Sequence, residues 1–279
     1  MRSEAVRPAG GDRVAAAFRR GRPVLIPYVT AGHPRLDALP AMIRAAREAG
    51  ADLMEVGLPF SDPLADGPVL QAAAARALAQ GVTVDQVFAA LSAARDVGLP
   101  LLLLTYVNPV LARGPERFLE EARAAGVDGL IVPDLPWAEA RDLERAARAR
   151  GMVLVPMAAP TSTDAHLKAI RRARGFVYGV SVTGVTGVRA TLDPASLAFA
   201  ARLKAALPLP VAIGFGIGTP EQARAVAQVA DGVIVGSALV RALEADPDDA
   251  PGVVRRVVGA FRTALDAEAA GSPAAGRDL

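Results

Sequence analysis

Short apolar runs of strand length recur along the chain, and each is followed by a turn signal and an alanine- and arginine-rich stretch with helical spacing. The runs are apolar at consecutive positions, which is typical of parallel strands covered on both faces. This pattern predicts strands at residues 24–29, 53–56, 101–106, 129–133, 153–157, 176–182, 211–214 and 233–235. The chain is therefore predicted to be a series of eight βα units.

A weak internal repeat supports the same division. The segments Glu48 to Asp52, Ala125 to Asp128 and Val229 to Asp231 resemble one another, and each ends a predicted helix and opens a strand. Eight such units favour a closed (β/α)8 TIM barrel. An open doubly wound sheet is the alternative, but no Gly-x-Gly-x-x-Gly motif follows the first run, so a dinucleotide-binding version has little support.

Two intervals between strand starts are long. Leu101 lies 48 residues after Leu53, and Val211 lies 35 residues after Phe176. We therefore expect extra helical material after the second strand and an insertion after the sixth, besides extra helical material at the N-terminus. Loops that follow barrel strands share the catalytic face, so these two segments are candidate lids.

The composition suits a large folded core. Apolar residues make up 52% of the 279 residues and charged residues only 22%, which excludes general disorder. We expect one TIM-barrel domain over residues 1–279, with flexible tails at residues 1–12 and 268–279. One helix is predicted to begin at Thr219-Pro220-Glu221-Gln222, which carries a capping threonine, a proline at the first helical position and a capping-box glutamine.

The charged residues argue against a nucleic-acid partner. Lys and Arg total 31 and Asp and Glu total 29, which gives a formal net charge of +2. The arginines are mixed with acids, as in the segment from Arg141 to Arg145, and this mixing is typical of solvated helix faces.

Other classes are excluded by what the sequence lacks. It has no cysteine, which excludes disulfides, thiol nucleophiles and cysteine metal sites, and its two histidines, His33 and His166, are too few for a histidine-based metal centre. No apolar run reaches the roughly 18 residues of a membrane span, and residues 1–13 lack the apolar core of a signal peptide. We expect a cytoplasmic protein with no membrane partner.

One acidic residue interrupts an otherwise apolar strand. Glu55 lies near the end of the second predicted strand, where a buried carboxylate is costly unless it is paired or functional. Asp66 follows in a segment rich in turn signals, on the candidate lid. A fixed acid on a strand and an acid on the adjoining lid form a candidate pair for acid–base catalysis. An ion pair for Glu55 and a plain turn role for Asp66 are the structural alternatives.

The few aromatic residues gather near predicted strand ends. Tyr28, Tyr106 and Tyr178 lie near the ends of strands, and Phe60 and Phe215 lie in turns that follow strands. Because aromatic residues make up only 4% of the chain, this concentration at one face predicts a pocket for a flat apolar ligand. Barrel core is the alternative, although core layers favour aliphatic residues over tyrosine.

Glycine-rich turns follow the last three predicted strands, at residues 183–187, 214–216 and 236–237. Each exposes backbone N–H groups, and the last can begin a helix whose N-terminus attracts an anion. Barrel phosphate sites are commonly built after strands 7 and 8. These turns therefore predict a phosphate site.

Together the motifs resemble the tryptophan synthase alpha subunit family. The segment from Glu55 to Gly67, EVGLPFSDPLADG, is similar to the highly specific signature of that family without a gap. Further segments match in the same order: Pro27 to Gly32, Tyr106 to Asn108, Pro133-Asp134, Ser181 to Gly187, Gly214 to Ile217 and Gly236-Ser237. The resemblance extends from about Phe18 to Leu265. It departs at His33, where many relatives have an acid, and at Gly179, where a bulkier side chain is common after Tyr178.

The resemblance implies a carbon–carbon lyase of L-tryptophan biosynthesis, which cleaves indole-3-glycerol phosphate to indole and glyceraldehyde 3-phosphate by a retro-aldol reaction. It implies that Glu55 performs both proton transfers, that Asp66 stabilises positive charge at the indole N–H, and that Thr186 meets Asp66 when the lids close. The substrate-binding residues that it implies are Tyr28, Phe60, Tyr106, Tyr178 and Thr186. The implied phosphate-binding residues are Gly187, Gly214, Phe215, Gly216, Gly236 and Ser237.

The resemblance also implies that this chain needs no metal or cofactor, and that a pyridoxal-phosphate-dependent beta subunit receives indole directly in an α2β2 assembly. Two other functions stay open. Another phosphosugar barrel enzyme, such as an isomerase of the same pathway, would share the phosphate loops but lack the signature from Glu55 to Gly67. A non-catalytic alpha-like subunit would keep the contact loops and lose an acid, whereas both Glu55 and Asp66 are present.

Overall fold

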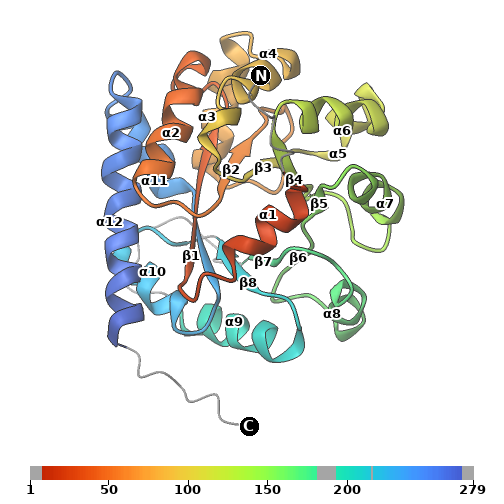
Figure 1. Ribbon diagram of the computed structural model, residues 1–279, viewed down its shortest axis with the longest axis vertical. Helices are drawn as coiled ribbons and strands as arrows, with labels where there is room; N and C mark the ends of the chain where they lie inside the picture. The colour runs from red at the N-terminus through yellow and green to blue at the C-terminus, as the bar shows by residue number, and fades with distance from the viewer. Residues whose placement is uncertain (1–7, 181–192, 215, 272–279) are drawn as a thin grey trace, which may run out of the picture.

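The computed structural model describes residues 8–180, 193–214 and 216–271, with side chains as far as residue 267. In these ranges, nine parallel strands form one sheet surrounded by helices (Figure 1). The strands are β1 Val24–Thr30, β2 Met54–Gly57, β3 Leu101–Leu104, β4 Val127–Ile131, β5 Val153–Leu154, β6 Met157–Ala158, β7 Val177–Val180, β8 Val211–Gly214 and β9 Gly232–Val235. The helices are α1 Gly10–Ala17, α2 Leu39–Glu48, α3 Pro68–Ala79, α4 Val84–Ser92, α5 Val107–Arg113, α6 Pro115–Ala124, α7 Arg141–Ala149, α8 Asp164–Ile170, α9 Pro194–Ala206, α10 Pro220–Ala227, α11 Ser237–Ala245 and α12 Ala250–Gly271, with short 3-10 helices η1 Leu36–Ala38 and η2 Arg95–Val97.

The sheet closes on itself as a barrel. Its strand order is β5-β4-β3-β2-β1-β9-β8-β7-β6, so β5 and β6 lie at the two ends of the order. Both belong to the single stretch 153–158, in which β5 pairs with β4 and β6 pairs with β7. The strand predicted at 153–157 is thus two short strands, because Pro156 has no N–H to contribute to the ladder. This stretch joins the two edges, and the predicted (β/α)8 TIM barrel is confirmed.

Side chains alternate across the barrel wall, as the pleat of a strand requires. In β1, Ile26 and Tyr28 pack in the barrel interior. Leu25 and Val29 of the same strand pack among the residues that contact the surrounding helices. Both faces of the strand are therefore buried, which explains why apolar residues occupy consecutive positions in the sequence.

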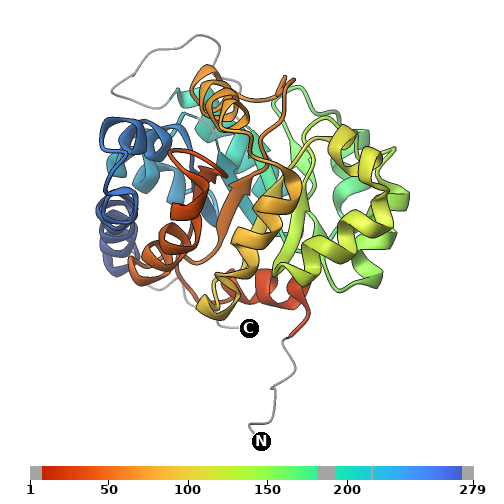
Figure 2. The same ribbon diagram turned by 90° about the horizontal axis from the view of Figure 1, so that it is seen from above.

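The extra helical material predicted at the N-terminus and after the second strand is present. Helix α1 lies across one end of the barrel (Figures 1 and 2), and the adjoining ring of Phe18 lies 5.0 Å from that of Phe176, centroid to centroid. Helices α3 and α4 both lie between β2 and β3. Helix α1 begins inside the tail expected at residues 1–12, and α12 continues into the tail expected at 268–279. Helix α1 begins at Gly10, because Gly11 is buried and donates its N–H to the Gly151 carbonyl, and α12 continues to Gly271.

The repeated aspartates have a common structural role. Asp52, Asp128 and Asp231 lie at the starts of β2, β4 and β9, and each carboxylate accepts a hydrogen bond from a backbone N–H at the start of the preceding strand. The donors are Leu25, Leu101 and Val211, at 3.1, 3.0 and 2.8 Å. The repeat seen in the sequence therefore links neighbouring strands at the amino end of the barrel.

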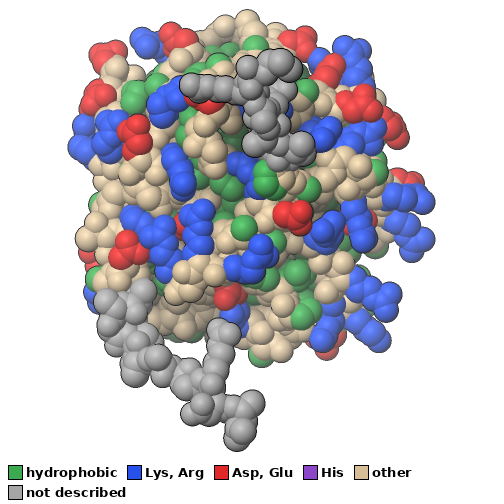
Figure 3. All heavy atoms as spheres, in the orientation of Figure 1, with side chains coloured by type: hydrophobic (Ala, Val, Ile, Leu, Met, Phe, Trp, Pro, Cys, Tyr) green, Lys and Arg blue, Asp and Glu red, His purple; other side chains and the backbone are tan. Residues whose placement is uncertain are grey.

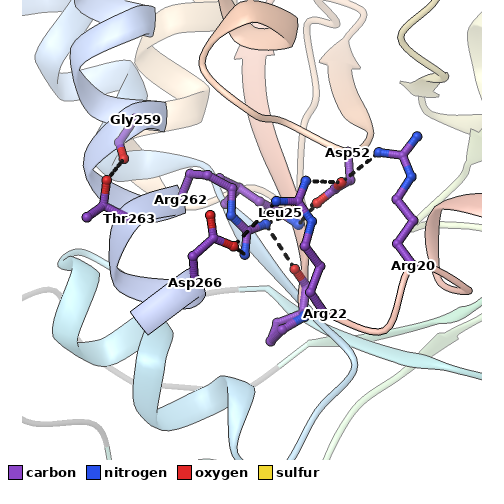
Figure 4. A network of polar contacts seen from close by, with 9 residues as sticks. Arg20, Arg22, Leu25, Asp52, Gly259, Arg262, Thr263 and Asp266 are labelled. Carbon is purple, nitrogen blue, oxygen red and sulfur yellow. Dashed lines mark hydrogen bonds and ion pairs between the residues drawn. The ribbon is translucent and has the colours of Figure 1, made fainter. Parts of the chain in front are cut away.

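Asp52 is also the centre of an ion-pair network (Figure 4). Its carboxylate lies 2.9 Å from guanidinium nitrogens of Arg20 and Arg22, which precede β1, and 3.2 Å from a nitrogen of Arg262 in α12. Asp266, one helical turn after Arg262, pairs with it at 2.7 Å. The network fastens α12 and the segment before β1 to the start of β2.

The surface follows the predicted charge pattern. On the face seen in Figure 3, arginine and acidic side chains are interspersed, as expected for solvated helix faces. The pairs Arg117–Glu121 and Arg145–Asp142 lie one helical turn apart. Within the described ranges, no helix combines the length and the apolar character that crossing a membrane requires.

Candidate active site

Strand β2 places a glutamate inside the barrel. Glu55 is paired in register with Tyr28 of β1 and Leu102 of β3, which both pack in the barrel interior. The residue is 1% exposed, and neither of its carboxylate oxygens has a hydrogen-bond partner among the described residues. Burial, and secondarily the charge of Asp66, raise the pKa of Glu55 to about 8. Glu55 is therefore mostly protonated at neutral pH.

The segment between β2 and α3 brings Asp66 to the same end of the barrel. The hydroxyl of Tyr106, just after β3, accepts a hydrogen bond from the Ala65 N–H at 3.1 Å and also bonds the Asp66 carboxylate. Burial raises the pKa of Asp66 to about 6, and the Tyr106 hydroxyl opposes this rise. At pH 7 Asp66 is mostly ionised whereas Glu55 is mostly protonated. The two carboxyl groups are thus prepared for different tasks.

The structure brings the predicted aromatic residues close to these acids. The Tyr28 hydroxyl lies 3.1 Å from Oγ1 of Thr30, and Phe60 stacks on Tyr106 with 5.2 Å between ring centroids. Tyr178, on β7, also packs in the barrel interior. Burial raises the pKa of all three tyrosine hydroxyls above the ordinary value, so they stay neutral hydrogen-bond donors.

Glycines make room for two of these rings. A Cβ on Gly57 would lie 2.2 Å from the Tyr28 hydroxyl oxygen, and one on Gly214 would lie 2.5 Å from the Tyr178 hydroxyl oxygen. Gly214 therefore makes room for the Tyr178 ring, a role in packing that was not predicted for it. After Tyr178, a Cβ on Gly179 would lie 2.5 Å from Cδ1 of Ile213, so Ile213 occupies the space that a larger side chain at position 179 would need.

An apolar cavity of about 410 Å³ opens beside Asp66 and Tyr178. This volume lies within the roughly 300–1,000 Å³ of small-molecule sites. Leu104, Val132 and Met157 line the cavity near these two residues. Among the described aromatic residues predicted for the pocket, Tyr178 is the one that lines this cavity. Tyr28 pairs in register with Glu55, and Tyr106, on which Phe60 stacks, bonds Asp66.

Two predicted phosphate-binding turns follow β8 and β9. Gly216 has a φ of 78°, a conformation that favours glycine. Gly236 precedes α11, whose first residue is Ser237, and no side-chain hydrogen bond from this N-cap position satisfies the first N–H groups of the helix. Three further predicted residues, Thr186, Gly187 and Phe215, lie outside the described residues.

The outer walls of the cavity were not among the predicted site residues. Trp137 and Ala140, in the segment between β4 and α7, and His166 of α8 line it. None of them belongs to a strand, so strand periodicity carried no signal for them. The available signal was Trp137 itself, because it is the one tryptophan of the chain and follows a predicted strand.

The two histidines lie in different places. His33 is 4% exposed and packs against α11, where its ring bonds the backbone of Val240. Burial, followed by the nearby charge of Arg76, lowers the pKa of His33, so it is neutral. His166 bonds the carbonyl of Met157 through Nε2 at 2.8 Å. In the part of the chain that the structure describes, no group of three or more acidic or histidine side chains could hold a metal ion.

Comparison with known proteins agrees with this geometry. The family model of the tryptophan synthase alpha chain matches residues 14–268. The tryptophan synthase alpha chain of Carboxydothermus hydrogenoformans is 48% identical over 236 residues, which cover 84% of this chain and 88% of that protein. The alpha chain of Gluconacetobacter diazotrophicus is 50% identical over 244 residues, covering 86% and 88%. The crystal structure of tryptophan synthase subunit alpha from Legionella pneumophila str. Paris has a TM-score of 0.84 at 32% identity, and the match covers 94% of this chain and 99% of that one.

The match extends over most of the sequence and over the whole barrel, and it includes the strand that carries Glu55 and the segment that carries Asp66. The chain therefore belongs to the tryptophan synthase alpha chain family.

Proposed function

We propose that Glu55 and Asp66 carry out the reaction of this family. As a member of it, the protein is a carbon–carbon lyase of tryptophan biosynthesis, which cleaves indole-3-glycerol phosphate to indole and glyceraldehyde 3-phosphate. The observation that carries the residue assignment is the buried, protonated carboxyl of Glu55 without a hydrogen-bond partner among the described residues. Burying such a group without compensation destabilises a fold, so a role in proton transfer accounts for its presence.

Glu55 performs both proton transfers of the retro-aldol reaction. Its neutral carboxyl first donates a proton to C3 of the indole ring. The resulting carboxylate then removes the proton from the hydroxyl group on the carbon attached to C3. The bond between that carbon and C3 breaks, its electron pair restores the indole ring, and the hydroxyl becomes the aldehyde of glyceraldehyde 3-phosphate. Glu55 ends the cycle protonated, as it began.

Asp66 stabilises the intermediate between the two transfers. Protonation at C3 places a positive charge on the indole nitrogen, and an ionised carboxylate hydrogen-bonded to that N–H lowers its energy. The pKa of about 6 keeps Asp66 ionised at neutral pH. The Tyr106 hydroxyl is hydrogen-bonded to both the Asp66 carboxylate and the neighbouring Ala65 N–H, so the carboxylate is in position before the charge on the indole nitrogen develops. Thr186 completes this arrangement by meeting Asp66 when the segment after β7 closes.

The substrate spans the mouth of the barrel. Its phosphate binds the turns after β7, β8 and β9, where the contacts come from Gly187, Gly214, Phe215, Gly216, Gly236 and Ser237. Its indole ring lies in the apolar cavity beside Asp66. The four aromatic side chains Tyr28, Phe60, Tyr106 and Tyr178 enclose the part between them. The elongated shape of the substrate suits this division, because β9 and β4 lie on opposite sides of the closed sheet.

The proposal includes a partner. Among the described residues, the exposed large apolar side chains are Leu64, at 87% exposure, and Leu111, at 59%. Both lie on segments that follow strands, at the end of the barrel that holds Glu55 and Asp66. Exposed apolar groups at one end of a protein suit a docking surface. A beta subunit docked there, carrying pyridoxal phosphate, receives indole over a short path in a cytoplasmic α2β2 assembly, and this chain itself uses no cofactor.

The test is indole release from indole-3-glycerol phosphate by the purified chain, with and without a tryptophan synthase beta subunit. We expect measurable release by the chain alone and a higher rate with the partner, because docking favours the closed position of Asp66. The parallel measurement uses Asp66→Asn, in which the partner still binds but no longer raises the rate. Full activation of this variant by the beta subunit contradicts the role given to Asp66.

A further inference from the structure

The apolar cavity continues beyond the walls that contact Asp66 and Tyr178. Part of its lining, which we call the outer lobe, comes from the segment joining β4 to α7 and from the stretch between β6 and the first turn of α8. The outer lobe is lined by Leu135, Pro136, Trp137, Ala140, Ser162 and His166. None of these residues has a part in the proton transfers or in the phosphate site proposed above.

Hydrogen bonds fix the first wall of the outer lobe. The N–H of Glu139 donates to the Pro136 carbonyl at 2.8 Å, and the N–H of Ala140 donates to the Trp137 carbonyl at 3.2 Å. These consecutive turns fix the backbone at Trp137, and with it the point from which the Trp137 side chain extends. The wall therefore exists before a ligand arrives, as is usual for small-molecule sites.

The second wall is equally fixed. The Ser162 hydroxyl accepts the N–H of Ala159 at 3.0 Å, and Nε2 of His166 bonds the carbonyl of Met157 at 2.8 Å. The guanidinium of Arg202 donates to the Pro160 carbonyl at 3.3 Å and joins this segment to α9. Because the hydroxyl and one ring nitrogen of this wall already have partners within the protein, the lobe is best suited to an apolar group.

The position of the lobe indicates what group reaches it. This step rests on the proposed function. With phosphate at the turns after β8 and β9 and the indole N–H at Asp66, the benzo edge of the indole ring points away from the phosphate, toward β4 and β6. The outer lobe continues in that direction, so it lies beyond the benzo carbons of the bound substrate.

We propose that the outer lobe receives substituents on the benzo ring, and that the enzyme therefore cleaves indole-3-glycerol phosphates that carry a small apolar group, such as methyl or chlorine, at a benzo carbon. Ala140 controls this tolerance. It is 2% exposed and lines the lobe, so a larger side chain at this position fills the space that the substituent needs.

The first experiment compares kcat/KM for the unsubstituted substrate and for substrates methylated at each benzo carbon in turn. In Ala140→Leu we expect kcat/KM for the best methylated substrate to fall by about tenfold or more, because one methylene in an apolar pocket changes kcat/KM by about tenfold or more. For the unsubstituted substrate we expect kcat/KM to change by no more than about threefold. Ala138→Leu is the matched control, since Ala138 is exposed two residues away and its variant should change neither value.

The outcomes separate the two proposals. A parent enzyme that releases no indole from any substrate contradicts the proposed function. Normal cleavage of the unsubstituted substrate, with rejection of every methylated one, overturns the inference about the lobe. An equal loss for both substrates in Ala140→Leu also overturns it. Trp137→Ala provides the opposite change, because it widens the lobe and should shift the preference toward ethyl over methyl substituents.

A binding measurement does not depend on activity. Trp137 is the one tryptophan of the chain, so its fluorescence reports on the outer lobe alone. An indole that carries bromine, an apolar heavy-atom quencher, on a benzo carbon should quench this fluorescence saturably in the parent and in Ala138→Leu, and much less in Ala140→Leu. Quenching that rises linearly in all three, as it does for free N-acetyltryptophanamide, shows that the lobe is not occupied and overturns the proposal.

Discussion

Asp52 lies two residues before β2 and Glu55 is the second residue of that strand; both are buried, yet their surroundings are opposite. The carboxylate of Asp52 accepts the N–H of Leu25 and contacts three arginines. The carboxyl of Glu55 has no hydrogen-bond partner among the described residues, and its pKa rises to about 8. The short stretch from Asp52 to Glu55 thus begins with a stabilised charge and ends with an acid that keeps its proton.

The difference shows how the barrel divides its tasks. At the amino end, the buried charge of Asp52 is balanced by arginines, and the aspartate stabilises the fold by joining β1, β2 and α12. At the carboxyl end, an uncompensated glutamate costs stability and is suited to proton transfer. The structure therefore predicts opposite effects when each carboxyl group is replaced by its amide.

The largest expected effect is on the rate of Glu55→Gln. The amide keeps the size of the side chain but cannot exchange a proton, so indole release should fall by about 10²- to 10⁴-fold. The circular dichroism spectrum should stay that of the parent. Glu48→Gln is the control, because Glu48 pairs with Arg255 at the surface and its variant should retain full activity. Near-normal turnover by Glu55→Gln would reject the catalytic assignment.

The next effect is on the stability of Asp52→Asn. The substitution removes the buried negative charge that pairs with Arg20, Arg22 and Arg262, so the free energy of unfolding should fall by about 3–5 kcal/mol. Urea unfolding measures this change. The folded fraction should still release indole at the parental rate, since Asp52 precedes β2 at the amino end of the barrel and has no part in the proton transfers. A variant that is as stable as the parent would show that the arginines do not depend on Asp52.

A third prediction concerns stability as a function of pH. The pKa of Glu55 is higher in the folded state, about 8, than the ordinary 4.5, so between these values the folded state holds the extra proton. The parent should therefore lose about 1.4 kcal/mol of unfolding free energy per pH unit from roughly pH 5 to 8, relative to Glu55→Gln. Urea unfolding of both proteins at several pH values tests this. A difference that does not change with pH contradicts the raised pKa.

A smaller effect is expected in the pH dependence of kcat/KM. The active form needs Asp66 ionised and Glu55 protonated, and their pKa values are about 6 and about 8. The value of kcat/KM should therefore fall about tenfold one pH unit below the first pKa and about tenfold one pH unit above the second. In Asp66→Asn the acid limb should disappear. The upper limb should move to lower pH, because the Asp66 charge helps to raise the pKa of Glu55. An unchanged acid limb in this variant would assign it to another group.

The smallest effect is expected at Asp231, the third aspartate of the repeat. Its ion pair with Lys204 is 2.6 Å long but lies at the surface, with side chains 29% and 44% exposed. Lys204→Met should therefore change the unfolding free energy by less than about 1 kcal/mol. A loss as large as that of Asp52→Asn would mean that surface pairs contribute as much to this barrel as the network around Asp52 does.

Much of the fold was predictable because it depends on local pattern. Consecutive apolar residues predicted where the strands lie, although β5 and β6 were predicted as one strand, since strands buried on both faces need such residues. The capping box at Thr219 marked the start of α10, where both of its hydrogen bonds form. Glu55 stood out as one acid in an apolar run, and the site is built around it. The three aspartates formed a visible repeat, but their shared acceptance of a backbone N–H from the preceding strand was not readable from spacing.

Other features depend on contacts between residues far apart in the chain, which periodicity does not encode. The sequence alone determined the strands, the acid on β2 and the family signature, because each depends on neighbouring residues. Only the tertiary structure decided that Asp52 meets Arg262, 210 residues away, that Tyr106 holds Asp66, and that Trp137 and His166 line one cavity. Each of these contacts exists because closure of the barrel brings segments from separate βα units together. The burial of the contacting side chains then determines which of them stay charged and which have shifted pKa values.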